Sequence, residues 1–383
     1  MDTQTILKNV ADVSSRFAAA RQERQQRRAL VAADFAALRD AGFLLTGVPV
    51  EQGGVWEDVR SSSRPICEML RILAHGDPAV ALVCAMHPSV LAFWLASPSV
   101  APSFQEAWTR QRHHIFQTAR DGAWWGTITS EPGSGGDLLR TKATAKGTAT
   151  QDSYLVTGQK QFGSGSGMTS YMITTALPEG ETTPDLFFLD MRGVPWDGSA
   201  GVTLTTPWDG HGMAATQSHA MAFVNFPATR SAWPGNVLKI IDATTGFIPS
   251  AFSAVIVGIV ETAVEAARRQ VAQRRDVLRS YDRVEWSRAE MEGWLIQQAY
   301  EGMLRAVEEG KEGRRRATQA KMAIAELAES ATGRICRVIG GGTFSRSSPF
   351  GYWHEDVRAL GFLRPPWGLA YDSLFEWSCS GAQ

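Results

Sequence analysis

Hydrophobic residues recur at helical spacing through the first part of the chain. We predict a helix over residues 11–42, ended by Gly42, then a loop at 48–54 and renewed helical pattern from 62 to about 94. The apolar positions that carry the first helix are Val13, Phe17, Leu30, Phe35 and Leu38. The charged run Arg21–Arg28 lies within it and is interpreted as a solvated helix face.

The pattern changes between Trp124 and Phe226, where Ser, Thr, Gly and Pro become frequent and short β-branched or aromatic runs appear. Such runs between turn residues predict strands. The expected strands are 154–156, 171–175, 186–189, 202–205 and 219–224.

Helical pattern returns after Pro234. We predict helices over 240–278, 285–309 and 314–339, the last ended by Gly340-Gly341-Gly342. The chain therefore reads as an α+β protein, with an N-terminal α-helical domain (1–122), a central β-domain (123–233) and a C-terminal helical bundle (234–383).

Composition narrows the class of protein. A chain of 383 residues has room for two or three domains, and its formal charge of −1 offers no field for nucleic acid or an anionic membrane. The apolar runs are interpreted as too short to span a membrane, and the N-terminus has no signal-peptide core. The four cysteines lack metal or disulfide spacing, so we expect a reduced, cytoplasmic setting.

Two glycine-rich segments are the strongest candidates for chemistry. The first is TSEPGSGGD at 129–137, and the second is TGQKQFGSGSG at 157–167. Glycines let a backbone approach a flat or phosphorylated ligand closely and leave N–H groups free to donate. We therefore predict two loops, called here the first and second loops, that close on one large cofactor.

These segments resemble motifs of the acyl-CoA dehydrogenase superfamily. The first loop is similar to T-E-P-G-x-G-S-D and the second to G-x-K-x-W/F followed by a small polar residue. Gly212–Ser218 resembles the G-M-R-x-T-x-S turn, and Ile339-Gly340-Gly341 resembles the I-x-G-G helix end. The resemblance covers nearly the whole chain. It implies a helical domain, a β-barrel-like domain and a C-terminal four-helix bundle, assembled as a homotetramer.

The resemblance also implies a flavin, FAD or alternatively FMN. Ser130 would meet the pyrimidine edge, Phe162 a ring face and Ser164 the flavin N5. Arg274 would reach the diphosphate of a cofactor held mainly by a neighbouring subunit, and Gly340 and Gly341 would border the ADP half. Each of these residues also has an ordinary structural alternative. Ser130 would cap a turn, Phe162 would be a core aromatic and Ser164 a turn hydroxyl. Arg274 would be solvated, and Gly340 and Gly341 would form a helix C-cap. Gly136 replaces the family's serine, which leaves FMN open.

The family's catalytic glutamate has no counterpart. Aligned without gaps, Arg364 stands at its position, and a guanidinium is not a base at neutral pH. Near the start of the long C-terminal helix, Pro249 stands where the family's CoA-binding arginine belongs, and no carboxylate is nearby. Asp356, Glu355 or Asp372 would supply the base only if a local insertion shifts the chain.

Without these two residues, the chain resembles the flavin monooxygenase branch of the superfamily, which includes dibenzothiophene monooxygenases. That branch accepts reduced flavin from a separate flavin reductase and reacts it with O2 on a small-molecule substrate. Its K-x-F-x-S-G loop and its helical histidine imply His87 and Ser164 as catalytic residues here, with a core histidine as the alternative for His87. An acyl-CoA dehydrogenase with a displaced base and a non-catalytic flavin-binding scaffold remain the other hypotheses.

Overall fold

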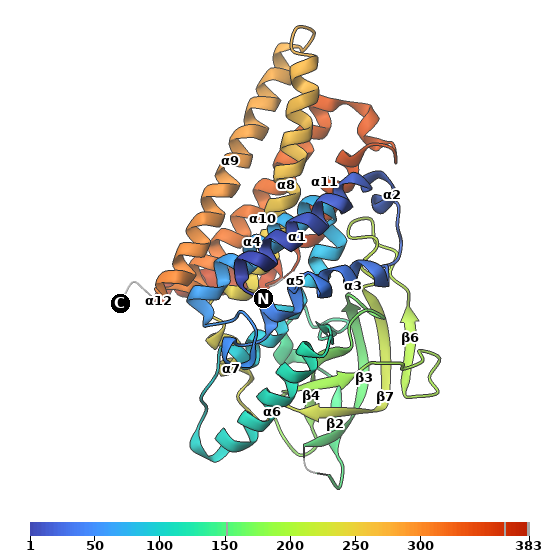
Figure 1. Ribbon diagram of the computed structural model, residues 1–383, viewed down its shortest axis with the longest axis vertical. Coiled ribbons are helices and arrows are strands. Elements are labelled where there is room, and N and C mark those ends of the chain that lie inside the picture. The colour runs from blue at the N-terminus through green and yellow to red at the C-terminus, as the bar shows by residue number, and fades with distance from the viewer. Residues whose placement is uncertain (151, 364, 381–383) are drawn as a thin grey trace.

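The computed structural model describes residues 1–150, 152–363 and 365–380. Helices lie before and after a central set of strands (Figure 1). The N-terminal helices are α1 (Thr3–Ala19), α2 (Arg21–Gln25), α3 (Ala32–Asp40), α4 (Val59–Gly76), α5 (Pro78–Leu95) and α6 (Pro102–Arg120), with short turns η1 (Phe43–Gly47) and η2 (Val50–Gln52). The single helix expected over 11–42 is therefore wrong: it is three helices.

The strands are β1 (Trp125–Thr127), β2 (Thr144–Gly147), β3 (Ser153–Gly163), β4 (Tyr171–Pro178), β5 (Asp185–Asp190), β6 (Val202–Thr206) and β7 (His219–Arg230), with the turn η3 (Leu138–Arg140). Five of them close a ring in the order β4-β2-β3-β7-β5, because β4 also pairs with β5. This closed sheet is the expected barrel-like domain. Its interior is a separate apolar cluster that includes Ile128, Val156, Phe187, Met221 and Phe223.

The C-terminal helices are α7 (Val237–Ala243), α8 (Phe247–Gln273), α9 (Ser280–Glu309), α10 (Gly313–Ile339), α11 (Pro349–Gly361) and α12 (Trp367–Ser380), with the turn η4 (Gly341–Phe344). Helices α8, α9 and α10 run side by side away from the barrel, and α11 packs against α10 (Figure 1). The expected long helix over 240–278 is divided at Gly246, where φ is +100°.

Two helices, α5 and α8, are long and apolar enough to cross a membrane by length and composition. The 18-residue α5 carries no Asp, Glu, Lys or Arg, so the interpretation that every apolar run is too short is wrong for this segment. Both helices are mostly buried inside the fold, where α5 contacts α8, α4 and β1. Burial by neighbouring elements accounts for their apolar surface without a membrane.

Candidate functional site

The first and second loops lie together at one end of the barrel. The Gln161 N–H donates to the Ser130 carbonyl at 2.8 Å, which forms an isolated antiparallel bridge between the loops. The Ser130 hydroxyl, half-buried, has no hydrogen-bond partner among the described residues. The predicted meeting of these two loops is therefore present in the structure.

A buried ion pair holds the two loops from beneath. Lys160 Nζ donates to Glu131 Oε1 at 2.5 Å, to the Thr175 carbonyl at 2.6 Å and to Thr141 Oγ1 at 3.1 Å. The backbone N–H of Lys142 donates to Glu131 Oε2 at 2.6 Å. Burial raises the pKa of Glu131, but the hydrogen bonds from Lys160, Thr141 and the Lys142 N–H outweigh it and hold that pKa below its ordinary value.

Phe162 is strained and exposed. A register irregularity between Lys160 and Gly163 interrupts β3, and Phe162 within it has φ +58°, a conformation that bulky residues rarely adopt. The residue is 48% exposed, and its ring lies edge-to-face with the Trp208 ring, with 6.0 Å between the centroids. Such strain with an exposed aromatic is typical of functional sites.

Ser164 follows directly and is almost fully buried, at 6% exposure. Its Oγ lies 2.7 Å from Ser218 Oγ, which in turn lies 2.7 Å from Thr216 Oγ1. The next residue, Gly165, has φ +81°, and a side chain there would also collide with Val83 of α5. The second loop is thus fixed against both α5 and the turn that precedes β7.

An apolar cavity of about 330 Å³ borders the first loop. It is lined by the first loop, the barrel and helices α5, α7, α8, α10 and α12. The apolar lining includes Met86, Val90, Phe93, Ile173, Leu186, Ile241, Ile248, Phe252, Leu369 and Trp377. Asp137 is the sole acidic residue in the lining among the described residues, and its Oδ1 accepts the Leu139 N–H at 2.9 Å as the cap of η3. The cavity suits a small apolar substrate.

His87 is fully buried in α5, and both of its ring nitrogens face backbone groups. Nε2 lies 3.0 Å from the Leu44 carbonyl, and Nδ1 accepts the Trp125 N–H at 3.2 Å. These partners require the neutral tautomer with the proton on Nε2. The contacts join α5 to η1 and β1, which favours the structural role for His87; a catalytic one stays a prediction.

We expect His87 to remain neutral to well below pH 6. Burial lowers its pKa from 6.5 to about 4, against the raising effect of the Leu44 carbonyl. Its stabilising contribution is full above the unfolded pKa and falls as the pH drops from 6.5 to 4, by up to about 3 kcal/mol in total. NMR titration of the imidazole, assigned with His87→Gln, measures this pKa. Titration of His87 near 6.5 would contradict the assigned burial and tautomer.

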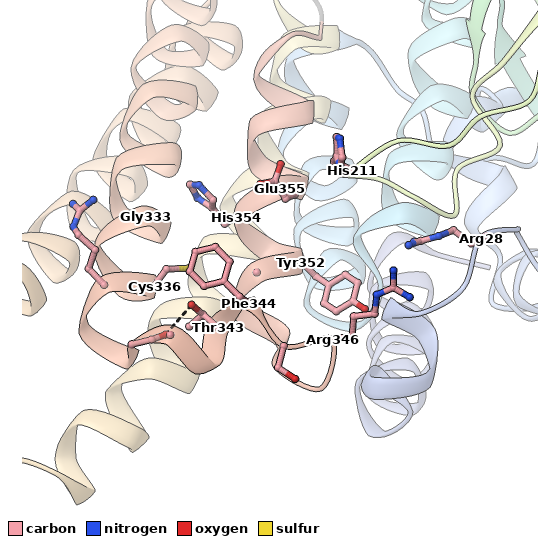
Figure 2. Close-up of a pocket in the computed structure, with 15 residues that line it drawn as sticks. Arg28, His211, Gly333, Cys336, Thr343, Phe344, Arg346, Tyr352, His354 and Glu355 are labelled. Atoms are coloured by element: carbon pink, nitrogen blue, oxygen red, sulfur yellow. Dashed lines mark hydrogen bonds between the residues drawn. The ribbon is translucent and has the colours of Figure 1, made fainter.

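Arg274, Gly340 and Gly341 form a second cluster at the far end of α10. Arg274 Nη1 donates to the Ile339 carbonyl at 3.3 Å. Gly340 and Gly341 line a cleft of about 700 Å³ together with Arg28, His211, Arg337, Phe344, Arg346, Tyr352, His354 and Glu355. Figure 2 shows Arg28, Arg346, His211 and His354 around the cleft, and the Thr343 hydroxyl donates to the Gly340 carbonyl. The excess of cationic groups favours an anionic ligand.

The C-terminal segment packs on the first loop at Gly136. A Cβ built there would lie 2.6 Å from Pro366 Cγ, and φ is +81°, so both space and backbone favour glycine. Lys321 fixes the same segment, with Nζ donating to the Gly361 carbonyl at 2.6 Å and to the Pro365 carbonyl at 2.9 Å. Arg364, which aligns with the family's glutamate, lies outside the described residues.

No protein-family model and no curated protein matches the sequence. Solved structures do match its fold. Butyryl-CoA dehydrogenase from Megasphaera elsdenii has a TM-score of 0.81 at 18% identity, covering 98% of each chain. FMN-bound TdsC from Paenibacillus sp. A11-2, a dibenzothiophene monooxygenase, has a TM-score of 0.79 at 19% identity, covering 98% of this chain and 97% of that chain. A nitrososynthase from Micromonospora carbonacea var. africana has a TM-score of 0.77 at 19% identity, covering 98% of this chain and 96% of that chain.

The chain has the acyl-CoA dehydrogenase fold. The sequence-based fold prediction is thereby confirmed. Both dehydrogenases and monooxygenases share this fold, so the reaction has to be argued from the site.

The three displaced-base candidates are not in the apolar cavity of this acyl-CoA dehydrogenase fold. Asp356 is half-buried, accepts the Met213 N–H at 2.6 Å and lines a small separate cavity beside Arg24; partial burial of the carboxyl raises its pKa to about 7. Glu355 borders the cationic cleft and pairs with Arg358. Asp372 is exposed on α12.

Sequence reasoning missed the groups that support the site. Thr216 and Ser218 lie within the turn motif, but only the fold brings them to Ser164. Glu131 and Lys160 lie within the two loop motifs, and their opposite charges could have suggested a pair. Trp208, which contacts Phe162, carries no local signal.

Proposed function

We propose that this protein is a flavin-dependent oxidoreductase, specifically a monooxygenase that takes reduced flavin from a separate reductase and oxygenates a small apolar molecule. The supporting observation is the apolar cavity beside the first loop, in which Asp137 is the sole acidic group among the described residues and already caps a turn. Removal of a proton from a thioester requires a base within hydrogen-bond reach. Oxygen transfer from a reduced flavin requires instead a dry, apolar site.

The residues of the two loops fit an isoalloxazine. The Ser130 hydroxyl lacks a partner among the described residues, the strained Phe162 offers an exposed ring face, and Ser164 offers a hydroxyl beside it. When bound, the flavin would supply the electrons that activate O2. In this proposal Ser130 orients its pyrimidine edge, Phe162 supports one ring face and Ser164 contacts N5.

The cofactor's phosphate end belongs to the second cluster in this proposal. Arg274, Gly340 and Gly341 lie at one end of α10, and the loop residues lie at the barrel. A homotetramer in which one chain supplies the loops and a neighbour supplies the α10 end would bring the two sets to one flavin. The contact of Gly136 with Pro366 leaves no room for the family's serine hydroxyl near the diphosphate, which is compatible with FMN.

The test separates the two reactions on the purified, flavin-loaded protein. Reduced FMN, indole and ¹⁸O₂ are expected to give an oxygenated product that contains ¹⁸O, while butyryl-CoA without air leaves the oxidised flavin unbleached. Bleaching by butyryl-CoA would overturn the monooxygenase proposal. A chain that takes up neither FMN nor FAD would instead support the scaffold hypothesis.

An acyl-CoA dehydrogenase is the second candidate, because Asp137 does line the cavity. Asp137→Asn distinguishes it. Under the dehydrogenase hypothesis this change removes the base and abolishes bleaching by a thioester. Under the monooxygenase proposal the variant retains oxygen incorporation, since its carboxylate serves only as the cap of η3.

A further inference from the structure

The hydroxyl groups of Ser164, Ser218 and Thr216 form a continuous hydrogen-bonded chain that ends on the Met213 carbonyl. Thr216 Oγ1 lies 2.8 Å from the Met213 oxygen, and the two hydroxyl–hydroxyl distances are both 2.7 Å. All three side chains are buried, with Thr216 fully so. Each hydroxyl has one proton to donate.

The donor and acceptor in each hydrogen bond of this series are determined by its last member, the Met213 carbonyl. A carbonyl oxygen cannot donate, so the Thr216 proton is committed to Met213. The contact between Thr216 and Ser218 then requires the Ser218 proton. The remaining contact, between Ser218 and Ser164, requires the Ser164 proton. Ser164 therefore has only oxygen lone pairs left to offer to a ligand.

Other contacts hold this end of the chain in place. Trp208 Nε1 also donates to the Met213 carbonyl, at 2.9 Å, and the Asp356 carboxylate accepts the Met213 N–H. The Gly165 N–H donates to the Thr216 carbonyl at 2.8 Å, which ties the second loop to the same turn. If the donors and acceptors in this series were exchanged, a lone pair of Thr216 Oγ1 would face the Met213 carbonyl oxygen. Such a contact is unfavourable in a buried site.

We infer that Thr216 and Ser218 are positioning residues that make Ser164 a hydrogen-bond acceptor, so that the site prefers reduced over oxidised flavin. This inference rests on the proposed function, in which Ser164 meets N5. N5 of a reduced flavin carries a proton and donates, whereas N5 of an oxidised flavin only accepts. If Ser164 Oγ is an acceptor, it can bind the N5 proton of the reduced flavin. With the oxidised flavin, the lone pairs of Ser164 Oγ and N5 would repel each other.

The test is the ratio of the FMN dissociation constants, oxidised over reduced, measured without air on the full chain. In Thr216→Val the Ser218 proton is released to Ser164, whose own proton can then face the flavin. We expect the ratio to fall about tenfold, which lowers the midpoint potential of bound FMN by about 30 mV. Ser218→Ala releases the Ser164 proton directly and is expected to shift the ratio in the same direction.

Thr216→Ser is the matched control, because it keeps the hydroxyl and is expected to leave the ratio near that of the wild type. An unchanged or increased ratio in both Thr216→Val and Ser218→Ala would overturn the inference while leaving the proposed function intact. So would a fall in Thr216→Ser as large as that in Thr216→Val. If the wild-type chain binds neither form of FMN or FAD, the proposed function itself fails. That outcome is distinguishable because it precedes any comparison of variants.

Discussion

Lys160→Met is expected to lower the free energy of unfolding by about 3–5 kcal/mol, the range for breaking a buried ion pair on one side. Lys160 is 1% exposed, and its loss leaves the Glu131 carboxylate buried without its cation and the Thr175 carbonyl without its donor. The two loops would also lose the link beneath them, so flavin affinity is expected to fall. Chemical denaturation followed by circular dichroism measures the stability.

The double variant Glu131→Gln with Lys160→Met is expected to be less destabilised than the sum of its parts, because no unpaired charge remains. Lys142→Met is the surface control, since Lys142 is exposed on the same segment, and it should change the unfolding free energy by no more than about 0.5 kcal/mol. Equal effects of Lys160→Met and Lys142→Met would show that the buried pair contributes nothing.

Arg24→Met is expected to have a comparable effect, about 3–5 kcal/mol. The buried guanidinium binds Asp34 through both terminal nitrogens, at 3.1 and 2.7 Å, and Asp77 through Nε at 2.7 Å. It also lies over the Phe17 ring, 3.7 Å from the centroid. Without Arg24, the Asp34 and Asp77 carboxylates would share a poorly solvated space with no cation between them. The start of α5 would be affected as well, because Asp77 is its N-cap.

Arg27→Met is the matched control for Arg24→Met. Arg27 also contacts Asp34, at 3.0 Å, but is partly exposed and shares its charge with the exposed Glu23. Its loss is expected to lower the unfolding free energy by about 1 kcal/mol or less. Denaturation midpoints of the two variants compare the sites directly. A larger effect at Arg27 than at Arg24 would contradict the assignment of Arg24 as the bridge.

The fold could be predicted from the sequence where local signals and spacing agree. The helix over 314–339 and the strands near 171–175 and 186–189 lie close to their observed bounds, because periodicity and turn residues both mark them. The helical pattern expected from 62 to about 94 is divided at Asp77, a break that the prediction missed although Asp77-Pro78 combines a helix cap with a first-turn proline.

The rest required tertiary contacts. The helix expected over 11–42 is divided into three. Within the second of them Arg24 turns inward to Asp34 and Asp77, whereas a charge run of this kind predicts a solvated face. The two loop motifs predicted a shared ligand site, but nothing local links Ser164 to Ser218, which is 54 residues away. Similarly, the sequence around His87 does not reveal that its two ring nitrogens form hydrogen bonds with the backbone of Leu44 and Trp125.

The contact between Gly136 and Pro366 also constrains how this protein can change over generations. A serine at 136 would meet both the Pro366 ring and a left-handed backbone, so replacing that proline with a smaller residue would remove the steric obstacle and leave the backbone strain. The two positions are therefore epistatic, and the order of substitution matters. A serine at 136 would require changes in both the C-terminal segment and the first loop, so we expect positions 136 and 366 to vary together among proteins of this fold.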